Sequence, residues 1–123
     1  MATLALETCA LHPRLDQNLL LTAAIVHDLG KTREFSYGAE LGISDEGRLL
    51  GHVAIGARIV EERAAAAGLS ADRRLPLVHC VLTHHGPDAA PGRRFGCPEA
   101  VALYRLNALD AAVKGVLEHG LGG

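Results

Sequence analysis

The sequence predicts an all-α domain of about five helices. Hydrophobic residues make up 49% of the 123 residues but aromatic residues only 3%. Leu, Ala, Val and Ile must therefore form the core, which favours packed helices over a β-sandwich. Apolar residues recur with a helical period in several segments, and Gly and Pro separate those segments. The length suits one domain, which we take to span residues 1–123.

The first two helices are predicted at residues 2–11 and 17–29. The first stops before Pro13 and has no capping residue in front of it, which indicates that the chain begins inside a helix. Asp16 is placed to cap the second helix, and residues 19–26 are apolar on nearly every side. A helix without a polar face is expected at the centre of the domain.

Residues 32–48 interrupt the helical period. They alternate weakly, and the stretch 45–47 (Asp-Glu-Gly) is a turn signal, so a small β-hairpin around residues 34–45 could form there. Helical periodicity returns at residues 49–67 and ends at Gly68.

Two further helices complete the predicted fold. Ser70 or Asp72 can cap a helix that runs to His85. The Gly- and Pro-rich loop 86–96 then separates it from a final helix at residues 98–119.

Six ionisable side chains are predicted to lie on apolar helix faces, because their neighbours three and four residues away are apolar. A single inward His is more often a hydrogen-bonded core residue than a ligand, and a buried Asp usually caps a helix or pairs with Arg. Burying charged groups without partners costs on the order of several kcal/mol each, whereas one cation centre would satisfy all of them. The six residues are His27, Asp28, His52, His84, His85 and Asp110.

Mixed nitrogen and oxygen ligands indicate a divalent transition metal (Mn, Fe, Co, Ni or Zn), with Mg as a further candidate. One or two ions could bind, since His27 and Asp28 project at different angles and Asp28 could bridge two ions. A two-metal centre activates water and clamps a phosphoryl oxygen, so that no Ser or Cys nucleophile is needed. The two common glycine-rich phosphate loops are absent from the sequence.

Four short elements occur in an order that is found in a known family. They are His27-Asp28-Leu29-Gly30-Lys31, Leu49-Leu50-Gly51-His52, Thr83-His84-His85-Gly86 and Asn107-Ala108-Leu109-Asp110. Their order and spacing resemble the HD-domain superfamily of metal-dependent phosphohydrolases over roughly residues 19–117. The second and third elements further resemble the branch in which an HD domain follows an OB-fold in bacterial 3′→5′ exoribonucleases.

The resemblance implies an HD-domain helical bundle with a mononuclear or binuclear metal site. Asp28 would bridge two ions in the binuclear form. The implied ligands are His27, Asp28 and Asp110 for one ion, and His52, His84 and His85 for the second.

Basic residues are candidates for substrate contacts. The resemblance implies that Lys31 acts in catalysis together with Asp28, by binding the phosphate or stabilising its charge, although a solvated helix end would equally account for this lysine. Arg93 and Arg94 follow the His pair and could bind a substrate phosphate, or form part of a solvated loop. Arg73 and Arg74 are interpreted as part of a solvated helix start.

The chain departs from the family pattern in two ways. The family has a further metal-binding His upstream of the His-Asp pair, and this chain is expected to lack that part of the first helix. It is also expected to lack the OB-fold in front of the helices. We expect a metal-dependent phosphohydrolase that acts on a nucleotide or a nucleic-acid end. The alternative is a non-catalytic metal-binding or regulatory HD module, inactive for want of the upstream His.

Composition restricts the partners and the location. Twelve Lys and Arg against fourteen Asp and Glu give a net charge of −2, so no overall basic field attracts nucleic acid or a membrane. No apolar run approaches the ~18 residues of a membrane span. Cys9, Cys80 and Cys97 are odd in number and widely spaced, which fits a reducing cytosol, and Cys80 is interpreted as a core thiol. We expect a cytoplasmic protein without a membrane partner, which could form a homodimer through apolar surface on its first helix.

Overall fold

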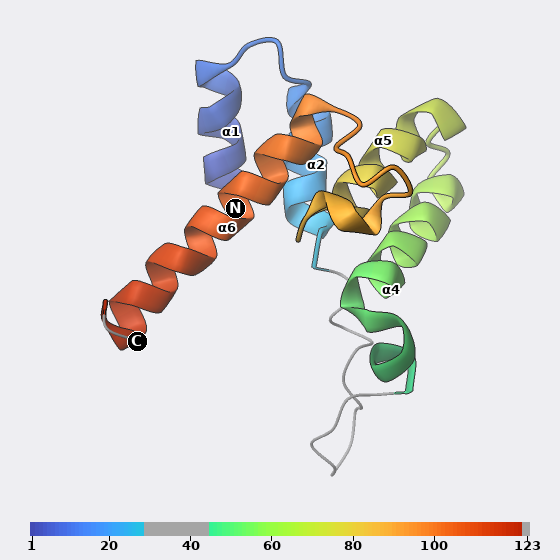
Figure 1. Ribbon diagram of the computed structural model, residues 1–123. Helices are drawn as coiled ribbons and strands as arrows, with labels where there is room; N and C mark the ends of the chain where they lie inside the picture. The colour runs from blue at the N-terminus through green and yellow to red at the C-terminus, as the bar shows by residue number, and fades with distance from the viewer. Residues whose placement is uncertain (29–44, 122–123) are drawn as a thin grey trace.

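The computed structural model describes residues 1–28 and 45–121, and for residues 45–50 and 52 it describes the backbone alone. Within these residues all regular structure is helical, as the sequence predicts (Figure 1). The β-hairpin expected around residues 34–45 falls almost entirely outside the described residues. The elements are α1 (Ala2–Leu11), α2 (Gln17–Val26), α4 (Asp45–Ala66), α5 (Ala71–Leu82), the short 3₁₀ helix η1 (Pro87–Ala89) and α6 (Pro98–His119).

Helix α2 lies at the centre of the bundle, as its apolar sequence predicts. It packs against α1, α5 and α6, while α4 packs mainly against α5 (Figure 1). The largest apolar side chains that are fully buried come from three different helices and are Leu20, Ile55 and Leu103. The core is therefore aliphatic, in agreement with the composition.

The start of α2 is fixed from two sides. The Asp16 carboxylate accepts a hydrogen bond from the Leu19 amide at 3.1 Å, which confirms the predicted cap. The Asp16 amide in turn donates to Glu99 Oε2 at 2.8 Å, and Glu99 is buried in the first turn of α6. One carboxylate thus joins the beginnings of two helices.

Helices α2 and α5 are both shorter than predicted at their carboxyl ends. Helix α2 stops at Val26 instead of residue 29, and α5 stops at Leu82 instead of His85. In each case a histidine ring donates to the carbonyl three residues before it, which is the carbonyl that the next helical amide would use. The two side chains His27 and His84 therefore end their own helices.

The start of α4 also differs from the prediction. Residues 45–47, expected to form a turn, belong to the helix, and the irregular position is Gly51 with φ 75° and ψ 160°. A positive φ of this kind is open to glycine at little steric cost, so the helix axis bends at Gly51.

The second half of α6 extends away from the other helices (Figure 1). Its apolar side chains there are exposed, with 48% of Val113 and 79% of Leu117 accessible to solvent. The apolar face of the last helix, on which Asp110 is predicted to lie, is therefore not buried in its last turns. Among the described residues, none of the helices combines the length and hydropathy needed to cross a membrane.

Candidate metal-binding site

The carboxyl ends of α2 and α5 meet at a cluster of polar residues. The rings of His27 and His84 pack edge to face, with their centroids 5.1 Å apart, and both side chains are buried. Each helix end carries a partial negative charge from its last carbonyl groups. Two such ends directed at one place favour a cation between them.

The hydrogen bonds of the two rings determine which nitrogen can bind a metal. His27 Nδ1 donates to the Ala24 carbonyl at 2.7 Å, and His84 Nδ1 donates to the Val81 carbonyl. Because a carbonyl can only accept, the neutral form of either ring has its hydrogen on Nδ1 and its lone pair on Nε2. Metal-binding histidines are commonly oriented in this way by a backbone carbonyl.

Asp28 lies between the two rings. Its Oδ2 is 3.1 Å from His27 Nε2, and its Oδ1 is 3.7 Å from His84 Nε2. The carboxylate is half-exposed, whereas both imidazoles are buried. Two ring lone pairs and one carboxylate therefore face each other, an arrangement of electron-pair donors that a bound cation would stabilise.

Burial keeps His84 in its neutral form. Desolvation lowers the pKa of His84 to about 4, against an opposing effect of its hydrogen bond to the Val81 carbonyl. The neighbouring rings of His85 and His27 lower this pKa further, and Asp28 raises it. The ring is thus neutral at pH 7, which is the form that binds metal ions.

His85 lies at the solvent side of this group. It is exposed, and its ring is tilted by 43° against that of His84 with the centroids 4.1 Å apart. We use the term histidine cluster for the four residues that the structure brings together, which are His27, Asp28, His84 and His85.

The donor set has the chemistry of a metal site, but the described residues do not form a complete one. No group of three or more His, Cys, Asp or Glu side chains in the described part of the chain is arranged to hold an ion. The side chain of His52 and the whole of Lys31 lie outside the described residues. Nitrogen and carboxylate oxygen donors on two helix ends nevertheless fit a divalent transition metal.

Asp110 is only partly buried, whereas the apolar helix face on which it lies suggested an inward position. Its Oδ2 is 3.0 Å from Lys114 Nζ, one turn further along α6, and about a third of its side chain is exposed. The second half of α6, to which Asp110 belongs, extends away from the other helices (Figure 1), and the assignment of Asp110 as a metal ligand stays a prediction. Helical periodicity shows which residues share a face but not whether another helix covers that face.

Arg93 and Arg94 are exposed in the loop that follows the histidine cluster. Arg93 has a φ of 54°, a left-handed conformation that is uncommon for residues other than glycine. The end of this loop is attached to α5, because the Gly96 amide donates to His79 Nε2 at 2.7 Å. The loop thus begins at the cluster and returns to the same helix.

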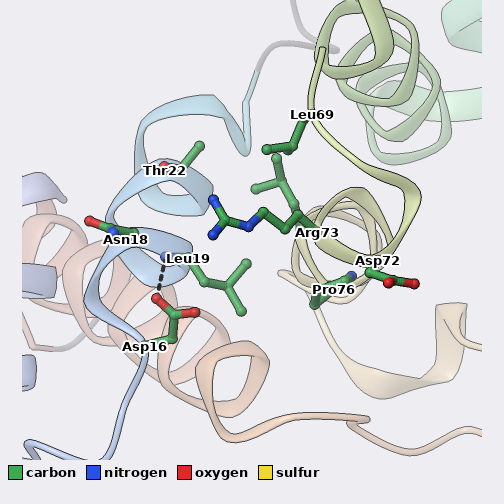
Figure 2. Close-up of a pocket in the computed structure, with 9 residues that line it drawn as sticks. Asp16, Asn18, Leu19, Thr22, Leu69, Asp72, Arg73 and Pro76 are labelled. Atoms are coloured by element: carbon green, nitrogen blue, oxygen red, sulfur yellow. Dashed lines mark hydrogen bonds between the residues drawn. The ribbon is translucent and has the colours of Figure 1, made fainter. Parts of the chain in front are cut away.

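A cavity of about 290 Å³ lies between the amino-terminal halves of α2 and α5. Figure 2 shows Arg73 reaching from α5 toward Asn18 and Thr22 of α2. Arg73 is exposed, in agreement with the solvated helix start expected from the sequence. The same expectation is wrong for Arg74, which is partly buried and donates to Glu61 Oε1 at 3.0 Å and to the Leu69 carbonyl. Nothing in the local sequence indicates which helix lies opposite α5, so no sequence signal could have located the cavity. The cavity is at the opposite ends of the two helices from the histidine cluster.

The chain belongs to the HD domain family, whose sequence profile matches residues 1–112. This finding confirms the resemblance on which the metal ligands were assigned, and HD domains bind divalent metals.

Two curated relatives show which proteins the chain is similar to. The 3′-5′ exoribonuclease YhaM of Bacillus licheniformis is 34% identical over 114 residues, covering 92% of this chain and 36% of the relative. The protein of the same name from Bacillus subtilis is 34% identical over 117 residues, covering 90% and 36%. The chain thus spans about a third of the length of these relatives. No solved structure gives a significant match.

Proposed function

We propose that the chain is a metal-dependent phosphohydrolase that acts on a nucleotide or on the 3′ end of RNA. The observation that carries the proposal is the meeting of His27, Asp28 and His84 at two helix ends, with both Nε2 atoms directed at one carboxylate. Membership of the HD domain family supports the hydrolytic class. The names of the relatives support RNA as the substrate.

The histidine cluster would hold the first part of the metal centre. The family pattern adds His52 and Asp110 as further ligands. A divalent ion supplies an activated water and neutralises charge on the phosphoryl group when it is bound. The residues of the chain orient the ligands. The Ala24 and Val81 carbonyls fix the orientation of the two rings, and the Asp28 carboxylate places its negative charge between His27 and His84.

The basic residues would hold the substrate. Arg93 and Arg94 are exposed close in sequence to His85, where their guanidinium groups can bind non-bridging phosphate oxygens in a bidentate manner. Lys31 follows Asp28 by three residues and would stabilise negative charge on the same phosphate.

The test is hydrolysis of a 5′-labelled single-stranded RNA by the purified chain with Mn²⁺, beside the same RNA carrying a blocked 3′ end and a small phosphodiester. We expect metal-dependent release of nucleotides from the open 3′ end. Asp28→Asn should reduce the rate by roughly 100-fold or more, as expected for a group that acts at the reacting phosphate. His119→Ala, a change on an exposed side chain at the end of α6, serves as the matched control and should leave the rate unchanged.

Elemental analysis of the same preparations separates the two candidate functions. Loss of metal from Asp28→Asn together with loss of hydrolysis supports the proposal. Bound metal without hydrolysis of any phosphoester would instead identify a non-catalytic HD module. Hydrolysis that survives chelation of divalent metals would contradict both.

A further inference from the structure

Two cysteines that the proposed function does not use lie next to each other. Cys80 is fully buried in α5, and Cys97 is partly exposed at the residue that precedes the first turn of α6. Their sulfur atoms are 3.9 Å apart, although the residues are separated by 17 positions in the sequence. Cys80 is thus more than the core thiol that the sequence suggested, because it faces a second thiol.

We propose that Cys80 and Cys97 form an oxidisable pair, a modification site at which a hydroperoxide converts the two thiols into a disulfide. A disulfide bond is about 2.05 Å long, so the sulfur atoms must approach by roughly 2 Å. Cys97 precedes the first turn of α6 and is partly exposed, whereas Cys80 is fully buried within α5, so the approach can come from rotation of the Cys97 side chain.

The two thiols differ in reactivity in the way that this chemistry requires. The hydrogen bond from the Cys80 thiol lowers the pKa of Cys97 to about 7, with a further contribution from the Ala100 amide at the start of α6 and against the effect of burial. The same hydrogen bond, together with burial, raises the pKa of Cys80. Cys97 is therefore the accessible thiolate that reacts first, and Cys80 is the resolving thiol beside it.

The reaction balances in two steps. The Cys97 thiolate attacks the hydroperoxide, so that an S–O bond forms, the O–O bond breaks and an alkoxide or hydroxide leaves with the electron pair. The product on Cys97 is a sulfenic acid. The Cys80 sulfur then attacks the Cys97 sulfur: the S–S bond forms, the S–O bond of the sulfenic acid breaks, and its hydroxyl leaves as water with the proton from Cys80. Two thiols are oxidised, and one hydroperoxide is reduced to an alcohol or water.

The disulfide would join α5 covalently to the start of α6. The segment between the two cysteines contains the His84–His85 pair and the two loop arginines. Oxidation would therefore restrict the loop that connects the histidine cluster to α6. The proposal does not depend on hydrolytic activity, since it rests on the two sulfur atoms alone.

The experiment treats the native chain with hydrogen peroxide, then alkylates the remaining thiols in denaturant. Trypsin cuts at Arg74, Arg93, Arg94 and Arg105, which places Cys80 and Cys97 on separate peptides. We expect these two peptides to be joined in the oxidised protein and to separate after reduction. Cys9 is the internal control, because it is buried without a thiol beside it among the described residues and should remain alkylatable.

Single substitutions keep the test decisive. Cys80→Ser should stop the reaction at the sulfenic acid, which dimedone traps on Cys97 at a rate at least ten-fold above that on Cys9. Cys97→Ser should abolish both products, and Cys9→Ser should change neither. The proposal is overturned if the joined peptides do not form in the folded wild-type chain, or if Cys97 in Cys80→Ser is trapped no faster than Cys9.

Discussion

His27 and His84 each combine two tasks in one ring. Nδ1 donates to a backbone carbonyl three residues earlier and so ends the helix, while Nε2 faces the Asp28 carboxylate. The position of the helix end and the orientation of the donor nitrogen therefore depend on the same side chain. Substitutions that mimic only one of the two nitrogens can separate these tasks.

Asn at position 84 can replace Nδ1 but not Nε2. We expect His84→Ala to lower the free energy of unfolding by about 2 kcal/mol or more in the absence of metal, because it leaves a cavity and removes the donor to the Val81 carbonyl. His84→Asn should lose clearly less, because its amide can still donate to that carbonyl. Urea unfolding of both variants in EDTA measures the difference, and equal losses would show that the hydrogen bond contributes little.

The neutral state of buried His84 predicts a pH dependence of the metal-free chain. The pKa is about 6.5 in the unfolded chain and about 4 in the folded one, so the unfolded state binds more protons between these values. The contribution to stability is complete above pH 6.5 and is lost as the pH falls toward 4. At pH 5 the loss from this group is about 2 kcal/mol by linkage. Urea unfolding midpoints at pH 7.5 and pH 5 should show this loss of stability in the wild type and a smaller loss in His84→Asn. An identical pH dependence of the two proteins would refute the role of His84.

At the scale of elements, α2 and α6 share a capping arrangement. A capping box normally has its second carboxylate three residues into the same helix, a position occupied here by Leu19. Glu99 of α6 takes that role instead by accepting from the Asp16 amide. The cap of the central helix thus also holds α6 in place.

Glu99→Ala should destabilise the chain by about 1–3 kcal/mol, because the Asp16 amide loses its hydrogen-bond acceptor, which is the carboxylate of the buried residue Glu99. Glu99→Gln keeps an acceptor oxygen and should lose less. Glu118→Ala, an exposed change near the end of the same helix, should stay within about 0.5 kcal/mol of wild type. Thermal unfolding followed by circular dichroism compares the three, and a neutral Glu99→Ala would contradict the shared cap.

The sequence predicts helix ends well where proline or an acidic cap defines them. The bounds 2–11 and 98–119 are confirmed, as is the start of α2 after Asp16. It predicts them less well where a side chain competes with the helix, since the carboxyl ends of α2 and α5 depend on a histidine ring that reaches back to a carbonyl. A pattern of apolar residues contains no information about such a bond.

In the candidate site, too, some features could be predicted from the sequence and others depended on tertiary contacts. His27, Asp28 and His84 could be grouped in advance because each lies at the end of an apolar helix that packs in the core. The surroundings of Asp110 could not, because they depend on how far α6 extends beyond its neighbours. The cavity beside Arg73 could not be predicted for a related reason, since it is formed with a helix about 50 residues away in sequence.

In the whole molecule, α2 and α5 face each other at both ends. Their amino-terminal halves line the cavity around Arg73 (Figure 2), and their carboxyl ends carry the histidine cluster. The two helices therefore run in the same general direction, and their dipoles add at the cluster instead of cancelling. The negative ends of both helices, two lone pairs and one carboxylate are thus concentrated at a single place in the metal-free protein.

Because the histidine cluster is rich in electron-pair donors, we expect a divalent transition metal to stabilise the entire fold. A metal that binds only the folded chain adds about 2.7 kcal/mol when its free concentration is 100 times its Kd, so Mn²⁺ should raise the Tm of the EDTA-treated protein. Mg²⁺ should raise it less, because it prefers oxygen ligands and the cluster supplies imidazole nitrogens. Asp28→Asn removes the carboxylate charge that lies 3.1 Å from His27 Nε2, and its Tm should therefore respond weakly to either ion. Equal shifts with Mn²⁺ and Mg²⁺, or an undiminished shift in Asp28→Asn, would place the metal away from the histidine cluster.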